Sequence, residues 1–311
     1  RDCLLSRGLG DVYKRQLPAL VGSVVYFGPR VLLVCGLSVA GCVFFEWGYR
    51  KVMKLDNTVG DLSAVVTGLL LAFVCPPSIP YWTILIGDFF AIVVVKQLFG
   101  GIGKNFMNPA LAARAFLFSW PVIMTTWVQP GQWPSLFGSN VDAVTAATPL
   151  ANLHQNLLPT ESLTTLFLGK TGGCLGETSA LLLLLGGLYL VLRRVIRLRI
   201  PLSYLSTVAL LTLLFPRGND PLLWMASQLL SGGLMLGAWF MATDYVTSPV
   251  TGWGQILYGV GCGCITVLIR YFGSYPEGVS YAILTMNACV VLLDKVGLPQ
   301  RFGTARKEAV Q

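Results

Sequence analysis

Long apolar runs alternate with short polar segments along almost the whole chain. A helix needs about 20 apolar residues to cross a bilayer, and most of these runs approach that length. Glycine and proline interrupt several runs, which is tolerated at membrane depth only where the backbone is buried in protein or lines a cavity. The pattern predicts ten membrane spans, at residues 17–28, 31–49, 60–75, 80–97, 108–128, 178–192, 201–216, 221–242, 254–271 and 278–293.

The composition agrees with an all-α integral membrane protein. Of 311 residues, 54% are hydrophobic and 12% are charged, whereas soluble domains carry about 25% charged residues. The net charge of +8 would suit a nucleic-acid partner, but the basic residues cluster at the ends of the apolar runs. That placement is typical of the positive-inside rule, so the sequence indicates a lipid bilayer and argues against nucleic acid.

Positive charge also predicts the orientation. Basic clusters follow the second, sixth and last predicted spans, which ten spans place on one side, the cytoplasm. The segment 129–177 contains a single lysine, Lys170, and then lies on the opposite side, while 295–311 forms a cytoplasmic tail. Arg270, near an outer end, counts against this scheme. The clusters are Arg50, Lys51 and Lys54; Arg193, Arg194, Arg197 and Arg199; and Lys295, Arg301, Arg306 and Lys307.

The first sixteen residues differ from the rest of the chain. Residues 1–16 have no apolar core and lack the pattern of a signal peptide. The apolar run that follows, 17–28, has only 12 residues, which is too short for a helical span. We therefore expect that foreign sequence replaces the true start of a truncated first span.

Two parts of the chain repeat one pattern. An apolar stretch, a break containing proline, a long span and an aromatic-glycine turn occur over 69–101 and again over 237–274. Pro77 matches Pro249 at an offset of 172, and Phe99 matches Phe272 at an offset of 173. Five spans are an odd number, so the halves, 17–128 and 178–294, would cross the membrane in opposite directions. Such inverted repeats place a site near the bilayer midplane, between the halves.

The polar stretch VDAVTAATPL, residues 141–150, has two interpretations. Thr148 followed by Pro149 is a common helix start with threonine as N-cap, and Asp142 and Thr145 would cap a preceding turn. Alternatively, Thr148 presents its hydroxyl for esterification by a phosphate-bearing cofactor. The two alanines before it leave room for a transferring enzyme, and Asp142 could orient the hydroxyl or a metal.

The segment LFGGIGKNFMNPALAAR, residues 98–114, is a second candidate site. It is either a tight turn before a helix that Pro109 begins, or a ligand site. Glycines allow close backbone approach, and the amides of Asn105 and Asn108 could read a polar ring edge, on one face if the segment is helical. It is not a dinucleotide fingerprint, and GKT at 169–171 lacks the upstream glycine of a phosphate loop.

Acidic residues inside apolar runs form a third group. Charges there are costly, so an ion path or a buried pair is expected; the alternative, contact with water at a span end, is strongest for Asp61 and Asp294. The candidates for an ion path are Glu46, Asp88, Asp244 and Asp294. The only histidine, His154, suits a solvated loop, and no metal site is predicted. Eight cysteines without a CxxC pair suit packing.

Six motifs in order then carry a family resemblance over nearly all of 17–294. The chain resembles the RnfD family, the D subunits of the Rnf ion-translocating electron-transport complex, which are similar to the B subunit of the sodium-pumping NADH:quinone oxidoreductase. The motifs are NTVGDLSAVVTGLLLAF, KQLFGGIGKNFMNPALAARAFLF, DAVTAATPL, GKTGGCLGETSALLLLLGG, FMATDYVTSPVT and YPEGVSYAILTMNA.

This resemblance implies a covalent flavin. In the family, a threonine in the pattern D-x-x-[ST]-x-A-T carries FMN through a phosphoester, and a flavin transferase attaches it from FAD outside the cytoplasm. Thr148 occupies that position here, although Ala146 stands where many such motifs have glycine. The related quinone reductase component also holds a non-covalent riboflavin, near a turn that corresponds to Asn105 and Asn108. The implied fold is urea-transporter-like, with two inverted five-span repeats.

The resemblance also implies the function. The chain would be a flavoprotein component of a ferredoxin:NAD oxidoreductase in the bacterial inner membrane, bound to other Rnf subunits, and would couple electron transfer to Na⁺ or H⁺ translocation. Acids implicated in sodium movement would correspond to Glu46, Asp244 and Asp294. The alternative is a solute channel or transporter of the same fold without a redox role, which would need no acceptor at Thr148.

Overall fold

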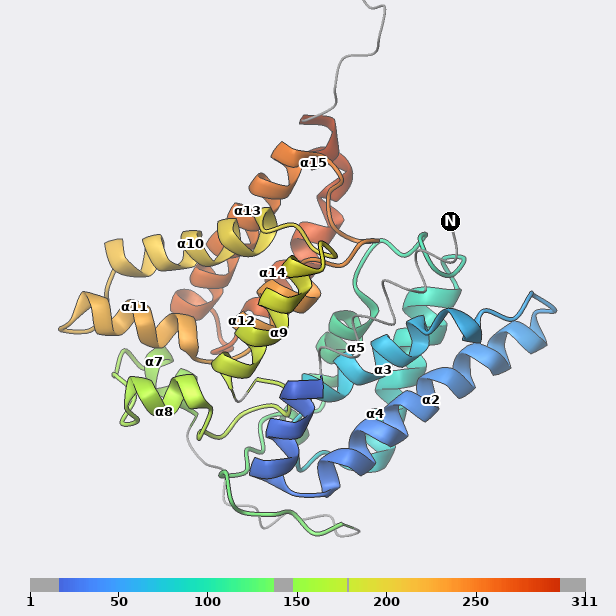
Figure 1. Ribbon diagram of the computed structural model, residues 1–311, viewed down its shortest axis with the longest axis horizontal. Coiled ribbons are helices and arrows are strands. Elements are labelled where there is room, and N and C mark those ends of the chain that lie inside the picture. Colours follow the sequence, from blue (N-terminus) through green and yellow to red (C-terminus); the bar gives the residue numbers. More distant parts are fainter. Residues whose placement is uncertain (1–16, 137–147, 178, 297–311) are drawn as a thin grey trace, which may run out of the picture.

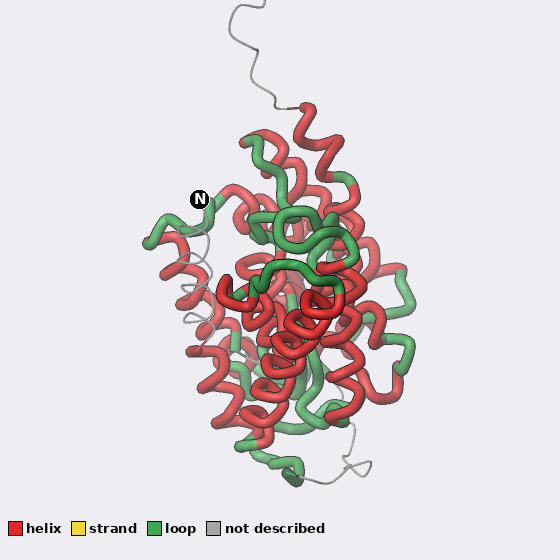
Figure 2. The backbone as a smooth tube through the Cα atoms, turned by 90° about the vertical axis from the view of Figure 1, so that its right-hand side faces the viewer, coloured by secondary structure: helices red, strands yellow, loops and turns green. Residues whose placement is uncertain are grey.

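The computed structural model describes residues 17–136, 148–177 and 179–296 of the chain. Within these ranges every regular element is a helix and no strand occurs, as Figures 1 and 2 show. The expectation of an all-helical protein is therefore confirmed. A helix satisfies its own backbone hydrogen bonds, which is what an apolar chain needs in lipid.

Helices of the first half follow the predicted spans, with one exception. The predicted span 108–128 ends at Leu117, and a short helix begins at Pro121, because proline disfavours helical backbone at the residue before it. The elements are a helix over Leu17–Phe27, α2 (Arg30–Val52), η1 (Val59–Asp61), α3 (Ser63–Phe73), α4 (Tyr81–Phe89), the π-helix η2 (Phe90–Gln97), α5 (Pro109–Leu117) and α6 (Pro121–Met124).

Helices of the second half include two sharp bends. The axis turns by 64° between α11 and the α12–η3 segment, where Gly232 has a left-handed φ of 71°, and by 62° between α14 and α15. The expected loop 129–177 carries two short helices. The elements are α7 (Pro149–His154), α8 (Leu163–Leu168), α9 (Ala180–Leu192), α10 (Arg199–Leu214), α11 (Pro221–Leu230), α12 (Leu234–Leu236), the π-helix η3 (Gly237–Met241), α13 (Gly252–Phe272), α14 (Val279–Ala288) and α15 (Val290–Val296).

Two helices are long and apolar enough to cross a membrane alone, namely α2 and α13. The two bent pairs each pass the same test when both members are taken together. The other apolar helices of the described residues have 10–17 residues. Length and composition therefore identify two spans, or four with the bent pairs, and the ten-span arrangement stays a prediction.

The halves of the chain occupy different sides of the molecule. Figure 1 shows α2, α3 and α4 on one side, and α10, α11 and α13 on the other. They meet where α5 contacts α14. Small residues bring helices together within each half: a Cβ on Gly68 of α3 would lie 2.8 Å from the Ser38 carbonyl oxygen of α2. Such close backbone approach is typical of helix pairs in membranes.

Gly68→Ala is expected to destabilise the first half. The added methyl group would meet the α2 backbone, and overpacking of this kind costs about 1–3 kcal/mol. Thermal unfolding of the purified chain in detergent should show a lower Tm. The control is Gly36→Ala in α2, where a Cβ would have no neighbour within 4 Å, so its Tm should not fall. Equal Tm values for both variants would contradict this packing.

Candidate functional site

Thr148 lines a cavity of about 240 Å³. Its backbone is extended, and its hydroxyl oxygen accepts a hydrogen bond from the Ala151 amide at 3.2 Å, so the predicted N-cap of α7 is confirmed. The side chain is partly exposed and lines the cavity. The hydroxyl oxygen that caps α7 is thus the same atom that Thr148 can offer to a ligand in the cavity. Asp142 and Thr145 lie outside the described residues.

Aromatic side chains form much of the wall of this Thr148 cavity. Phe118, Trp127 and Tyr275 line it, and the rings of Phe118 and Tyr275 lie 5.6 Å apart, centroid to centroid. The glycine-rich segment 171–173 completes one side. Ser231 also lines the cavity, and its buried hydroxyl has no hydrogen-bond partner among the described residues. The cavity thus offers flat apolar faces together with a polar atom that a ligand could bind.

A buried ionic cluster borders the Thr148 cavity, which Glu177 and Glu277 line. Arg114 of α5 donates to Glu177 at 3.2 Å and to Ser280 of α14 at 3.2 Å, and it pairs with Glu277. The Gly233 amide, at the break before α12, donates to Glu277 at 3.2 Å. Arg114 is 2% exposed. One arginine facing two carboxylates holds charge beside the cavity, where water is scarce.

The sequence did not identify this cluster as a site. Glu177 and Glu277 lie 63 and 163 residues from Arg114, so no spacing rule connects them. The available signal was chemical: each charged residue sits in or next to an apolar run, where an unpaired charge is costly.

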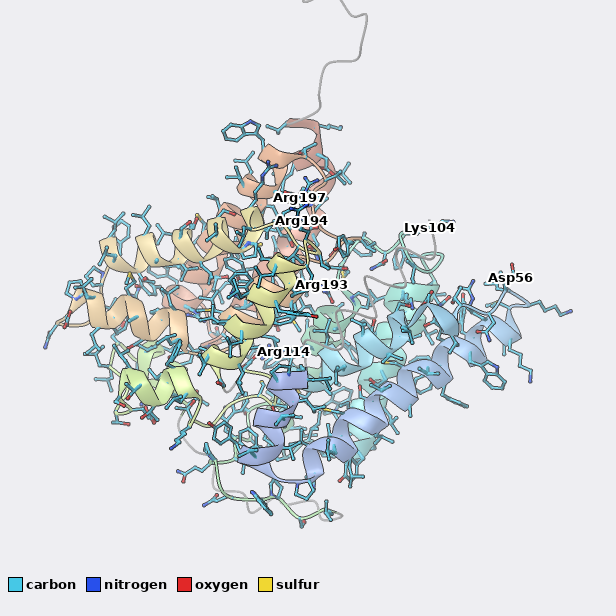
Figure 3. The ribbon with its side chains drawn as sticks, viewed as in Figure 1. Asp56, Lys104, Arg114, Arg193, Arg194 and Arg197 are labelled. Atoms are coloured by element: carbon cyan, nitrogen blue, oxygen red, sulfur yellow. The ribbon has the colours of Figure 1, made fainter. Side chains whose placement is uncertain are left out.

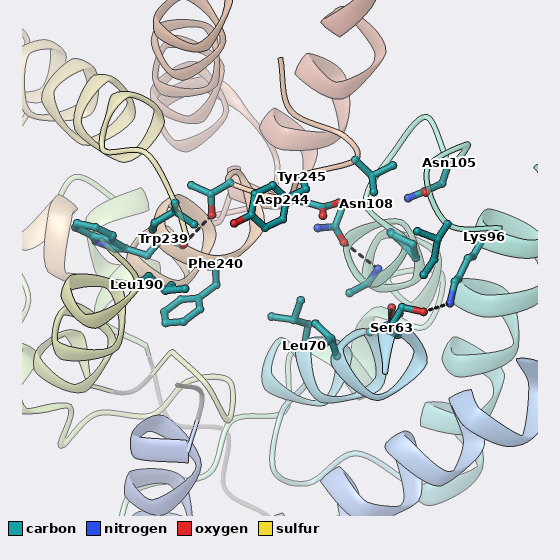
Figure 4. A pocket seen from close by; sticks show the side chains of 18 residues that line it. Ser63, Leu70, Lys96, Asn105, Asn108, Leu190, Trp239, Phe240, Asp244 and Tyr245 are labelled. Atoms are coloured by element: carbon teal, nitrogen blue, oxygen red, sulfur yellow. Dashed lines mark hydrogen bonds between the residues drawn. The ribbon is translucent and has the colours of Figure 1, made fainter. Parts of the chain in front are cut away.

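A second cavity, of about 110 Å³, lies between the two halves and contains both predicted asparagines (Figure 4). We call it the Asn108 cavity. Asn108 caps α5 by accepting from the amides of Ala110 and Leu111 at 3.1 and 3.4 Å, while Asn105 donates to the Met107 carbonyl at 3.2 Å. Because Asn105 precedes α5, the condition for a shared helical face, that the segment is helical, is not met. A turn, not a helix, brings both amides to one cavity.

The opposite wall of the Asn108 cavity comes from the second half. Trp239 and Phe240 of η3 and Asp244 after it line this wall (Figure 4). The Trp239 indole N–H is buried and has no hydrogen-bond partner among the described residues. Asp244 accepts from the Thr247 hydroxyl at 3.0 Å. The cavity therefore combines aromatic surface, amides, a carboxylate and an unused donor.

Glu46 forms a buried ion pair next to this cavity. Its carboxylate receives hydrogen bonds from Lys96 at 2.8 Å, from Gln97 at 2.9 Å and from Thr58 at 2.8 Å. Glu46 is 0% and Lys96 3% exposed. Lys96 also donates to Ser63 at the start of α3, and both residues line the Asn108 cavity. Sequence analysis left an ion path, a buried pair or contact with water for Glu46, and the structure supports the buried pair.

The remaining acids lie apart from one another. Asp88 of α4 is buried and accepts from Ser38 at 2.6 Å, but its Oδ2 has no partner among the described residues. Asp294 accepts from the Val250 amide at 2.9 Å at the start of α13, and Asp61 accepts from the Ser63 amide at 3.0 Å.

His154 does not lie free in a loop. It is the last residue of α7, so the expected place in a loop is wrong; its side chain is partly exposed, and its Nδ1 is 3.0 Å from the Arg270 carbonyl oxygen. Within the described ranges, no three His, Cys, Asp or Glu side chains gather as metal ligands.

Comparison with known proteins agrees with the resemblance seen in the sequence. The chain belongs to the NQR2, RnfD, RnfE family, which it matches over residues 5–303. It is 48% identical to the D subunit of the Na⁺-translocating ferredoxin:NAD⁺ oxidoreductase complex of Acetobacterium woodii, over 94% of this chain and 90% of the relative. It is 44% identical to the proton-translocating counterpart from Clostridium ljungdahlii, over 98% and 94%. It is 42% identical to the D subunit of the ion-translocating oxidoreductase complex of Stutzerimonas stutzeri, over 92% and 89%.

Glu46→Gln is expected to lower stability strongly. It leaves Lys96 buried without a counter-charge, and breaking one partner of a buried pair costs about 3–5 kcal/mol. Replacing both residues, as Glu46→Leu with Lys96→Met, removes both charges and should recover most of the loss. Unfolding midpoints in detergent measure both effects, with the exposed Asp56→Asn as control. A double variant no more stable than Glu46→Gln would contradict the pairing.

Proposed function

We propose that this chain is the membrane flavoprotein component of a redox-driven ion pump of the Rnf type. Its family and the names of three relatives, all D subunits of ion-translocating oxidoreductases, support this function. Electrons would pass between ferredoxin and NAD⁺ through partner subunits, coupled to Na⁺ or H⁺ translocation. The observation that carries the proposal is the Thr148 hydroxyl, which lines a cavity with aromatic walls.

The residues of the Thr148 cavity fit a phosphate-linked flavin. Thr148 would hold FMN through its hydroxyl oxygen: an O–P bond replaces the O–H bond, with FAD as donor and AMP as the leaving group. Phe118, Trp127 and Tyr275 offer flat faces for a ring, and the unpartnered Ser231 hydroxyl offers a hydrogen bond. The bound flavin would supply one-electron and two-electron transfer. Arg114 and its two carboxylates would set the electrostatic surroundings.

The Asn108 cavity fits a second, non-covalent flavin such as riboflavin. Asn105 and Asn108 supply amides, and Trp239 supplies both an aromatic face and an unused N–H donor. A ring with carbonyl and N–H groups along its edge would satisfy such a set of donors and acceptors. The shared origin of the walls supports a ligand held between the halves.

Two matching helix breaks support the inverted-repeat architecture. Leu62, before α3, and Gly232, before α12, both have left-handed backbone, with φ of 63° and 71°. Their numbers differ by 170, close to the offsets of 172 and 173 in the sequence repeat. Each break adjoins a cavity and a buried ionic cluster. Lys96 donates to the Ser63 hydroxyl at the first break, and Glu277 accepts from the Gly233 amide at the second. Paired breaks of this kind are typical of transporter folds with two inverted repeats.

The arrangement in space supports opposite membrane sides for Thr148 and for the turn that carries Lys104 and Asn105. Arg194 and Arg197 lie at one end of the molecule in Figure 3, and Lys104 lies toward the same end. In the same view, Figure 1 shows α7, which Thr148 caps, displaced toward the other end. If the basic end faces the cytoplasm, Thr148 lies outside, where a flavin transferase would act.

Among the four candidate ion-path acids, Asp88 has the strongest support. Glu46 is neutralised by Lys96, Asp244 is bonded to Thr247, and Asp294 caps backbone amides. Asp88 alone among these four keeps a buried oxygen without a partner in the described part of the chain. A mobile Na⁺ or proton would find an available ligand there.

Variants of Thr148 separate its two roles and test the flavin. Thr148→Ser keeps a hydroxyl and should keep a fluorescent flavin band after denaturing electrophoresis of protein co-expressed with a flavin transferase. Thr148→Asn keeps an N-cap but has no hydroxyl, so the band should vanish while the Tm stays near that of the parent. Thr171→Ala, in the same cavity, is the control and should keep the band. A band that survives in Thr148→Asn would indicate another attachment site, and the absence of a band in the parent would favour the solute-channel alternative.

Asn105→Ala is expected to weaken the second flavin. A lost hydrogen bond to a buried ligand costs about 1–3 kcal/mol, or roughly tenfold in affinity. The measurement is the amount of flavin that acid denaturation releases from purified protein, determined by chromatography. Asn57→Ala, on an exposed loop, should release as much as the parent. Equal release from Asn105→Ala would remove this residue from the site.

A further inference from the structure

A third cavity, of about 350 Å³, lies beside the basic loop between α9 and α10. Its lining includes Arg194 and Arg197 from that loop, Thr243 and Ser248 from the segment before α13, and Gln255 in the first turn of α13. Figure 3 labels Arg194 and Arg197 in the upper part of the view. We call this the Gln255 cavity.

The two arginines of the Gln255 cavity present positive charge to a ligand. Arg194 and Arg197 are exposed, and neither forms an ion pair within the described ranges. The neighbouring carboxylates are engaged elsewhere: Asp294 accepts from the amides of Val250 and Thr251, and Asp244 accepts from Thr247. A guanidinium fork matches the oxygens of a phosphate.

Gln255 supplies an independent sign of a ligand. Its Nε2 donates to the Pro249 carbonyl at 3.1 Å, which fixes the amide, while its Oε1 is buried without a hydrogen-bond partner among the described residues. The residue is only 8% exposed. A buried acceptor without a donor costs stability, and a hydroxyl group of a ligand would satisfy it. The phosphodiester group of a phospholipid has no hydroxyl of its own, so the donor has to come from the rest of the headgroup.

Apolar side chains beside the cavity indicate where the ligand comes from. Leu202, Val250 and Trp253 are 55%, 77% and 69% exposed next to the cavity-lining residues. Such a surface would contact acyl chains if the cavity opens at the level of lipid headgroups. Basic pockets between helices near the membrane surface bind anionic headgroups.

We propose that the Gln255 cavity binds the headgroup of an anionic, hydroxyl-bearing phospholipid such as phosphatidylglycerol. Arg194 and Arg197 bind the phosphate, and Gln255 Oε1 accepts from a glycerol hydroxyl. Phosphatidic acid offers the phosphate without the polyol, and phosphatidylcholine adds a cation without a hydroxyl. Ile196, Thr243 and Tyr245 line both this cavity and the Asn108 cavity, so a bound headgroup contacts the wall of the neighbouring site.

The test is lipid binding to the delipidated full chain in neutral detergent, measured by native mass spectrometry. Phosphatidylglycerol should bind more tightly than phosphatidic acid or phosphatidylcholine. Arg194→Gln with Arg197→Gln should weaken phosphatidylglycerol about thirtyfold, since each basic residue near a membrane surface contributes about 1 kcal/mol. The control with the same change of charge, Lys51→Gln with Lys54→Gln, changes exposed residues outside the cavity and should leave binding unchanged.

Gln255→Leu adds a chemical readout. It should weaken phosphatidylglycerol about fivefold, the value of one hydrogen bond, and leave phosphatidic acid unchanged. Equal losses in the arginine and lysine double variants would overturn the site, because general surface charge would then explain binding. Unchanged lipid selectivity in Gln255→Leu would overturn the role of the hydroxyl. Tight binding of soluble glycerol 3-phosphate without phosphatidylglycerol binding would overturn the lipid as source.

Discussion

The structure depends on one constraint: in a medium without water, every interrupted helix and every charge has to be satisfied by the protein itself. The breaks at Leu62 and Gly232 free backbone groups that a continuous helix would bond. The Asp61 carboxylate accepts from the Ser63 amide at one break, and the Glu277 carboxylate accepts from the Gly233 amide at the other. The same breaks leave cavities, so the polar cost of interrupting a helix and the ability to hold a ligand have one origin.

The two cavities differ in chemistry although they adjoin matching breaks. The Asn108 cavity has amides, a carboxylate and a neutralised Glu46–Lys96 pair at its border. The Thr148 cavity is lined by a hydroxyl and by two carboxylates that share one arginine. Charges at hydrogen-bonding distance interact strongly where the surrounding dielectric is low. We propose that this is how the redox state of a flavin affects ion movement: a change in ring charge acts on buried groups that water does not screen.

Much of the helix plan could be predicted from the sequence, because hydrophobic runs and their Gly and Pro interruptions are local signals. Thr148 and Asn108 were correctly placed before Pro-initiated helices. The π-helical continuation of α4 and the helix end at Leu117 were not predicted, although Pro121 is a local signal for the second. The Arg114 cluster could not be predicted, since its members are joined only by the packing of α5 against α14.

The central claim is that Thr148 serves as a flavin anchor as well as a helix cap. Its most direct test is mass spectrometry of proteolytic fragments from the chain purified with its partner subunits. The account predicts a fragment heavier by FMN less one water, with fragmentation placing the addition on Thr148. An unmodified Thr148 in protein that retains electron-transfer activity, or the addition on Thr145, would contradict it.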